Sequence, residues 1–191
     1  MGRIIVSENV TLDGVVEDPS GTEGFERGGW IGRIGDRGRD EAAKVALDEA
    51  LSTEALLVGR RTYEFLGARW PARSGALADR LNSQSKYVVS STLREPDWNN
   101  TTVLAGDAVD AVSKLKEATS GDIVVPASIR LVRTLIEQDL VDELRLMVYP
   151  VVLGAGERLF GETSSAMRMR LVDMRTVDDL AYLTFLAARD A

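Results

Sequence analysis

The chain has 191 residues, of which 45% are hydrophobic and 28% charged, and it contains neither cysteine nor histidine. Without these residues it can form no disulfide or thiolate nucleophile, and it lacks the usual general base of serine hydrolases and the commonest zinc ligand. The formal net charge of −7 disfavours binding to nucleic acid or anionic membranes, so a local cationic site must hold any bound phosphate.

Length and composition predict a single domain over residues 1–191. The N-terminal stretch MGRIIVSENV is too short and too interrupted for a signal peptide, and no window approaches about 18 consecutive apolar residues. We therefore expect a soluble, cytoplasmic protein that binds neither nucleic acid nor a membrane.

Short apolar runs rich in β-branched residues alternate with helical patterns through most of the chain. Strands are predicted at 3–7, 55–58, 87–90, 102–104 and 123–125, and helices at 38–51, 62–67, 75–84, 107–118 and 128–138. Such runs suit strands that are buried on both faces of a sheet. Because parallel strands need crossover connections, the alternation predicts a largely parallel sheet with helices on both faces.

The C-terminal part of the chain has a different pattern. A long extended run covers 144–153, and Pro150 within it indicates a bulge or an edge position. Two further strands, at 167–175 and 180–187, are predicted to form a hairpin, which adds antiparallel pairs. The predicted fold class is therefore α/β, with three layers and a mixed sheet that is mostly parallel but ends in a C-terminal antiparallel hairpin.

Residues 17–40 fit neither pattern, because this stretch holds seven glycines with Phe25 and Trp30 among them. Two interpretations stay open. The segment could be a flexible surface loop, or it could be a lid or substrate loop, since long segments without regular structure tend to be functional in compact domains. A tryptophan in such a loop needs a surface to pack against.

A possible anion site follows the strand predicted at 55–58. Gly59 permits a tight turn, and a helix that opens at Thr62 points its first N–H groups beyond the end of the strand. Arg60 and Arg61 add positive charge there, and arginine suits phosphate because its planar guanidinium makes paired hydrogen bonds. Taken alone, this motif could equally be two surface arginines that balance an acidic protein.

Two other predicted strands also end in groups that suit phosphate. YVVSST at 87–92 ends in hydroxyl groups, and IVVPASI at 123–129 leads into a helix with Ser128 as a possible cap. In open α/β sheets, ligands bind outside the carboxyl ends of the strands. In VVLGAGERLF at 151–160, the two glycines, Gly154 and Gly156, would allow a ligand to approach the backbone closely.

The order of these motifs resembles the dihydrofolate reductase superfamily, specifically the branch of the reductase domain of bacterial riboflavin biosynthesis and its stand-alone relatives. The resemblance covers nearly the whole chain. It is carried by TLDG at 11–14, GGW at 28–30, VGRRTYE at 58–64, VVSS at 88–91 and LVDELRLMVYPVVLGAGERLF at 140–160. The last segment is the most specific to the riboflavin-type branch.

The resemblance implies NADPH as the cofactor and a set of residues that bind it. This set comprises Gly59, Arg60, Arg61, Thr62, Ser90, Ser91, Ala127, Ser128, Gly154 and Gly156. The paired arginines would favour the 2′-phosphorylated cofactor, and the two serines would flank its adenosine side. Where relatives usually carry a glycine-containing loop, this chain has Pro126-Ala127-Ser128, which limits how closely backbone N–H groups can approach a phosphate.

For the catalytic site, the resemblance implies Asp13 as a substrate-facing carboxylate and Trp30 as a residue near the substrate, with no metal. Asp-Gly is also an ordinary turn pair, so a structural role for Asp13 stays open. The proton that accompanies hydride transfer could come from solvent or from a carboxylate such as Asp13. Hydride transfer places few demands on side-chain acid–base chemistry, so a chain without histidine or cysteine can perform it.

The implied function is NADPH-dependent reduction of a small-molecule substrate of the 5-amino-6-(5-phosphoribosylamino)uracil class, in a homodimer paired through the C-terminal strands. The zinc deaminase that bifunctional relatives carry is excluded, because its histidine and cysteine ligands are missing. Two alternatives stay open: reduction of a pterin or another small carbonyl or imine, and non-catalytic binding of a nucleotide or other ligand.

Overall fold

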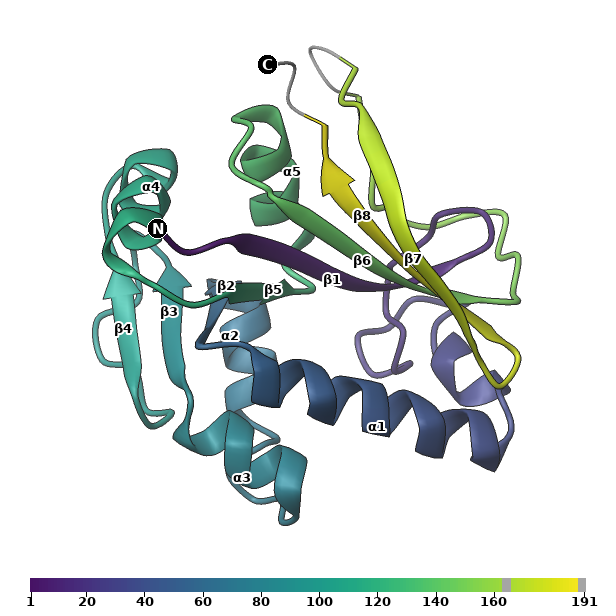
Figure 1. Ribbon diagram of the computed structural model, residues 1–191. Coiled ribbons are helices and arrows are strands. Elements are labelled where there is room, and N and C mark those ends of the chain that lie inside the picture. Colours follow the sequence, from purple (N-terminus) through teal and green to yellow (C-terminus); the bar gives the residue numbers. More distant parts are fainter. Residues whose placement is uncertain (163–165, 189–191) are drawn as a thin grey trace. The chain divides into compact units, whose positions relative to one another are not determined.

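The computed structural model describes residues 1–162 and 166–188 (Figure 1). Eight strands form a mixed sheet in the order β4-β3-β2-β5-β1-β6-β8-β7, which confirms the predicted fold class. The chain divides into two compact units. The first unit comprises Met1–Val6 and Ala46–Asp142, and the second comprises Ser7–Val45 and Glu143–Ala191. A single domain over the whole chain stays a prediction.

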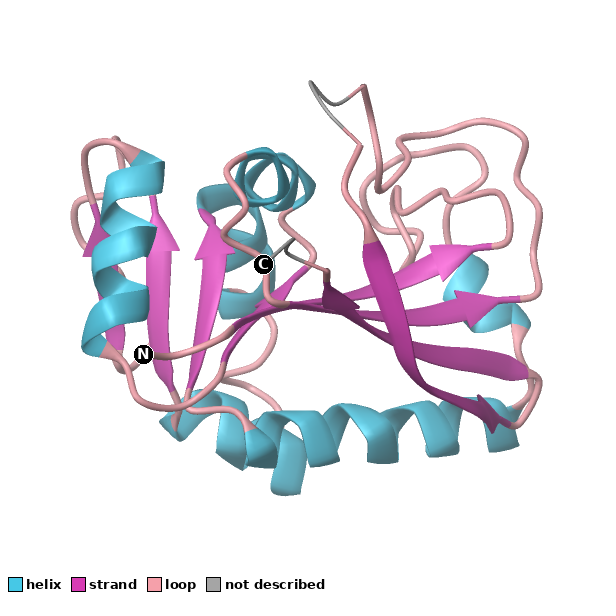
Figure 2. Cartoon of the chain, turned by 45° about the horizontal axis from the view of Figure 1, so that its top comes forward, coloured by secondary structure: helices cyan, strands magenta, loops and turns pink. Residues whose placement is uncertain are grey.

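The first unit contains the parallel part of the sheet. Its strands are β2 (Ala55–Gly59), β3 (Ser85–Val89), β4 (Thr101–Leu104), β5 (Ile123–Pro126) and the start of β1 (Ile4–Thr11). Strand β2 pairs in parallel with both β3 and β5, and β3 pairs in parallel with β4. Figure 2 shows neighbouring strands of this unit pointing the same way. The apolar run at the start of β2 is buried, as predicted for a strand covered on both faces.

Helices cover both faces of the strands in the first unit. They are α2 (Arg60–Gly67), α3 (Ala76–Ser83), α4 (Ala108–Ala118) and α5 (Ile129–Glu137). Figure 1 shows α2 and α3 on one side and α4 and α5 on the other. This separation follows from right-handed crossovers, because the chain moves outward from β2 to β4 and then returns to β5.

The second unit contains the antiparallel part of the sheet. Its elements are the rest of β1, η1 (Trp30–Arg33), the start of α1 (Asp36–Ser52), β6 (Glu143–Tyr149), β7 (Met169–Val177) and β8 (Leu180–Ala187). Strand β8 pairs in antiparallel fashion with both β6 and β7, which confirms the predicted hairpin. The core of this unit includes Trp30, whose ring meets the Tyr149 ring edge to face with 5.1 Å between centroids.

Two predicted boundaries need correction, whereas the predicted start of α4 is confirmed. The strand predicted at 144–153 ends at Tyr149, because Pro150 has no N–H to continue the hydrogen-bond ladder. Helix α2 begins at Arg60 rather than at Thr62. Helix α4 begins after Asp107, whose side chain accepts hydrogen bonds from the N–H groups of the first turn, so it is an N-cap of the expected kind.

Residues 17–29 form a loop, and regular structure in the segment 17–40 begins at Trp30. The segment includes η1 and the first turn of α1, which begins at Asp36. Among the residues described, no helix is long and apolar enough to cross a membrane.

Candidate functional site

Three segments lie at the carboxyl ends of parallel strands in the first unit, and together we call them the strand-end rim. They are residues 59–62 after β2, 90–92 after β3 and 126–128 at the end of β5. Two hydrogen bonds join them. The Gly59 N–H donates to Ser128 Oγ at 3.0 Å, and Arg60 Nη1 donates to Thr92 Oγ1 at 2.5 Å. The structure therefore brings the three predicted strand ends to one edge of the sheet.

Beyond β2 and β5, the chain turns to opposite faces of the sheet. These strands are neighbours, yet β2 leads into α2 and β5 leads into α5, on opposite faces of the sheet (Figure 1). The two connections therefore diverge beyond the strand ends, which is the usual ligand position in open α/β sheets.

The Arg60 side chain is held at the rim by two acceptors. Its Nε donates to Glu64 Oε1 at 2.7 Å, one turn along α2, while Nη1 donates to Thr92. The side chains of Arg60 and Glu64 are 47% and 52% exposed, and Arg61 is also exposed. The first N–H groups of a helix have no partner within the helix. The start of α2 thus combines backbone donors with positive charge, which is a suitable environment for phosphate.

The loop at the end of β5 has a backbone conformation that glycine adopts without strain. Ala127 has φ of 50° and Ser128 has φ of 63°, both in the left-handed region. Each side chain makes this conformation cost about 1 kcal/mol. The chain therefore keeps the turn although it lacks glycine, and strain of this kind concentrates at functional sites.

Ser128 does not cap α5, contrary to the prediction. It stands at the N-cap position, but its side chain makes no cap hydrogen bond and instead accepts from Gly59. The Ser128 hydroxyl thus accepts the hydrogen bond of the Gly59 N–H, which a phosphate oxygen could otherwise accept.

The two predicted serines at the end of β3 differ in their surroundings. Ser90 Oγ accepts from the N–H groups of Thr92 at 3.2 Å and Leu93 at 3.0 Å, so it stabilises the turn. Ser91 is exposed. A role in nucleotide binding stays a prediction for both.

In the second unit, Asp13 binds the backbone of the loop that follows β6. Its Oδ2 accepts from the Gly154 N–H at 2.7 Å, and its Oδ1 accepts from Thr11 Oγ1 at 2.7 Å and from the Leu153 N–H at 3.2 Å. The Thr11 hydroxyl and these backbone donors together outweigh partial burial and lower the pKa of Asp13 to about 2. Asp13 is therefore ionised at neutral pH.

Trp30 and Gly156 pack inside the second unit. Trp30 is fully buried, and its Nε1 donates to the Glu17 carbonyl at 2.9 Å. Gly156 has φ of 114°, and a Cβ there would lie 2.8 Å from Val15, so close packing requires glycine. Contact of Trp30 with a substrate and of Gly156 with a cofactor stay predictions.

Asp18 organises the glycine-rich segment, and the sequence analysis missed it. Its carboxylate accepts from the N–H groups of Thr22 and Phe25, and its carbonyl accepts from those of Gly21 and Gly29. Burial acts to raise the pKa of Asp18, but the backbone hydrogen bonds lower it further, so the net pKa lies below its ordinary value. The Asp18-Pro19 pair before several glycines was an available signal, because aspartate often stabilises turns through backbone N–H groups.

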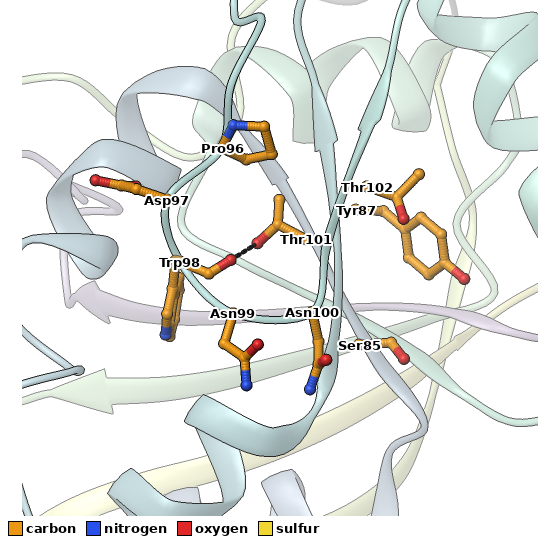
Figure 3. Close-up of a pocket in the computed structure, with 9 residues that line it drawn as sticks. All are labelled: Ser85, Tyr87, Pro96, Asp97, Trp98, Asn99, Asn100, Thr101 and Thr102. Carbon is orange, nitrogen blue, oxygen red and sulfur yellow. Dashed lines mark hydrogen bonds between the residues drawn. The ribbon is translucent and has the colours of Figure 1, made fainter.

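A hollow of about 520 Å³ lies elsewhere in the first unit (Figure 3). It is lined by Ser85, Tyr87, Pro96, Asp97, Trp98, Asn99, Asn100, Thr101 and Thr102. Because Ser85 and Thr101 begin β3 and β4, the hollow is near the amino ends of these strands, away from the rim. We favour the rim as the candidate site, because the hollow is open and its lining residues carry no positive charge. Within residues 1–162 and 166–188, no group of three acidic side chains could hold a metal ion.

The fold and the rim define the class as a dihydrofolate reductase-like α/β protein. Residues 3–182 match the family described as the RibD C-terminal domain, and the chain belongs to this family.

The chain is also similar to a curated protein and to solved structures. The chain is 30% identical over 179 residues to the uncharacterized protein YyaP of Bacillus subtilis (strain 168), covering 91% of this chain and 88% of that protein. It is similar in fold to a putative riboflavin biosynthesis protein from Shewanella sp. PV-4, with a TM-score of 0.77, 21% identity and coverage of 99% of this chain and all of that one.

A further fold match is a Thermotoga maritima protein described as a diaminohydroxyphosphoribosylaminopyrimidine deaminase/5-amino-6-(5-phosphoribosylamino)uracil reductase. Its TM-score is 0.63 at 16% identity. The match covers 98% of this chain but 57% of the Thermotoga protein, so this chain spans little more than half of that protein's length.

Proposed function

We propose that the protein is an NADPH-dependent reductase of the class that acts on 5-amino-6-(5-phosphoribosylamino)uracil. The observation that carries the proposal is the strand-end rim, where the start of α2, Arg60 and the left-handed turn at 127–128 meet beyond β2 and β5. Membership of the RibD C-terminal domain family supports the reductase class. The name of the Thermotoga protein suggests the substrate class.

The residues at the rim fit a dinucleotide phosphate. Gly59 has no side chain to obstruct a ligand at the start of α2, and the glycine-like turn at 127–128 leaves its backbone in the form that relatives build with glycine. Arg60 and Arg61 would hold the 2′-phosphate, and the nicotinamide would supply the hydride. The protein's own contribution is then to orient both reactants and exclude water, with the proton drawn from solvent because Asp13 is ionised.

Titration of the purified protein with NADPH and with NADH, followed by nicotinamide fluorescence, tests the cofactor. We expect saturable binding of both nucleotides, with NADPH bound more tightly. No saturable response to either would contradict the proposal and favour the binding of another ligand.

Turnover assays then test the substrate class. We expect NADPH oxidation with the ribosylaminouracil phosphate and none with dihydrofolate. The reverse result would assign the protein to pterin reduction instead.

We also propose that two copies pair through β7, one of the two edge strands of the sheet. Leu171, Val172 and Met174 on this strand are 49%, 42% and 68% exposed, which is unusual for an unpaired edge. In a symmetric dimer, the β7 edge of each copy would be covered by that of the other. Light scattering should give a dimer for the wild type and a monomer for a variant with Val172→Lys and Met174→Lys. A monomeric wild type at micromolar concentration would contradict the proposal.

A further inference from the structure

The direction of the Arg60 guanidinium is fixed by two acceptors on different segments. Glu64 lies one turn along α2 and accepts from Nε at 2.7 Å, while Thr92 lies in the loop after β3 and accepts from Nη1 at 2.5 Å. Because a guanidinium is planar and rigid, contacts at two of its nitrogens set the orientation of the whole group. They use only part of its donor capacity, so further N–H groups can bind a ligand.

We propose that Glu64 and Thr92 determine how strongly the protein prefers a 2′-phosphorylated nucleotide over an unphosphorylated one; this inference rests on the proposed function. Thr92 orients Arg60 without changing its charge, so it strengthens binding of the phosphate. Glu64 also orients Arg60, but its carboxylate offsets the positive charge and repels a phosphate. The two residues therefore act on the preference in opposite directions.

The exposure of the Arg60 and Glu64 side chains limits how strongly they can affect the preference for a 2′-phosphate. The Arg60 and Glu64 side chains are 47% and 52% exposed, and ion pairs with this exposure are weak and screened by salt. A phosphate can therefore compete with Glu64 for Arg60 without a large change in the fold. The preference for the 2′-phosphate is then moderate, and a single side chain can adjust it.

Two variants separate the roles. Glu64→Gln removes the negative charge but keeps an oxygen that can accept from Nε, whereas Thr92→Val keeps the shape of the side chain but removes the acceptor for Nη1. Glu117→Gln is the matched control, because it changes the net charge equally at an exposed position on α4. Dissociation constants for NADPH and NADH are measured for each protein by nicotinamide fluorescence, at low and high salt.

We expect Glu64→Gln to bind NADPH about threefold more tightly and Thr92→Val to bind it about threefold more weakly. NADH affinity should stay the same in all variants, and Glu117→Gln should match the wild type with both nucleotides. High salt should abolish the gain in Glu64→Gln, because the effect is a screened charge interaction.

The outcomes distinguish failure of this inference from failure of the proposed function. The inference is wrong if the wild type binds NADPH but each variant changes NADPH and NADH affinity equally. It is also wrong if both variants shift NADPH affinity in the same direction or leave it unchanged. In these cases the reductase proposal stands. If the wild type binds neither nucleotide, the proposed function is wrong and this inference falls with it. Thermal melting of each variant verifies that a loss of binding does not reflect unfolding.

Discussion

The strand-end rim of the first unit and the loops around Asp13 and Asp18 in the second both carry charged side chains, but the partners of these charges differ. The two carboxylates accept hydrogen bonds from backbone N–H groups of their own unit. Arg60 is held by exposed side chains at a surface. A charge surrounded by backbone donors stabilises a loop, whereas a charge held at a surface can also bind a ligand. Variants of the two carboxylates should therefore change stability, and variants of the rim arginines should change nucleotide binding.

The largest expected effect comes from Asp18→Ala. This change removes a buried carboxylate that binds the N–H groups of Thr22 and Phe25, so the free energy of unfolding should fall by about 3 kcal/mol. Urea denaturation measures the change, with the exposed Asp40→Ala as a control expected to stay within about 0.5 kcal/mol of the wild type. Equal stability of the two variants would show that Asp18 does not organise its loop.

Asp13→Asn should have a smaller effect that depends on pH. The folded-state pKa of Asp13, about 2, lies below its ordinary value of 3.8, so ionised Asp13 stabilises the folded state above about pH 4. This contribution, about 2 kcal/mol, is lost as the pH falls from 3.8 towards 2. Urea denaturation should therefore show the variant less stable than the wild type at pH 6, with the difference shrinking near pH 2. A difference that does not change with pH would contradict this account of Asp13.

At the rim, the double variant Arg60→Ala, Arg61→Ala should lose about tenfold in NADPH affinity and much less in NADH affinity. Its free energy of unfolding should match the wild type closely, because exposed ion pairs contribute little to stability. Fluorescence titration and urea denaturation measure the two quantities. Equal losses for the two nucleotides would refute the assignment of these arginines to the 2′-phosphate.

The smallest expected effect is a gain in stability. Ala127→Gly should raise the free energy of unfolding by about 1 kcal/mol, because glycine adopts φ of 50° without strain. Ala105→Gly is the matched control in another exposed loop where φ is not positive, and there glycine should lower stability or leave it unchanged. A loss of stability in both variants would mean that the turn at 127–128 is not strained.

The sequence predicted the fold well where local patterns and global topology agree. Alternating buried strands and amphipathic helices implied parallel crossovers, and Asp107 marked the start of α4 because aspartate satisfies the free N–H groups of a first turn. The sequence places the end of this strand at residue 153 instead of Tyr149, because the apolar pattern continues past Pro150. Strand periodicity records burial and not hydrogen bonding, so it could not locate this end.

The candidate site was predictable in its residue types but not in its contacts. The spacing of Arg60 and Glu64 is that of a helical ion pair and could have been read from the sequence. The bonds from Arg60 to Thr92 and from Gly59 to Ser128 depend on strand order and could not. The partners of Asp18 are backbone N–H groups, so the Asp-Pro pair before the glycines was its signal in the sequence and no pattern of side-chain types marked it.

The most direct test of the rim as the nucleotide site is an NMR titration of isotope-labelled protein with NADPH. We predict saturable shifts of the backbone amide signals of Gly59, Arg60, Arg61 and Ser128, with the largest at the start of α2. Saturable binding that leaves these signals unchanged while others move would place the nucleotide elsewhere and contradict the account.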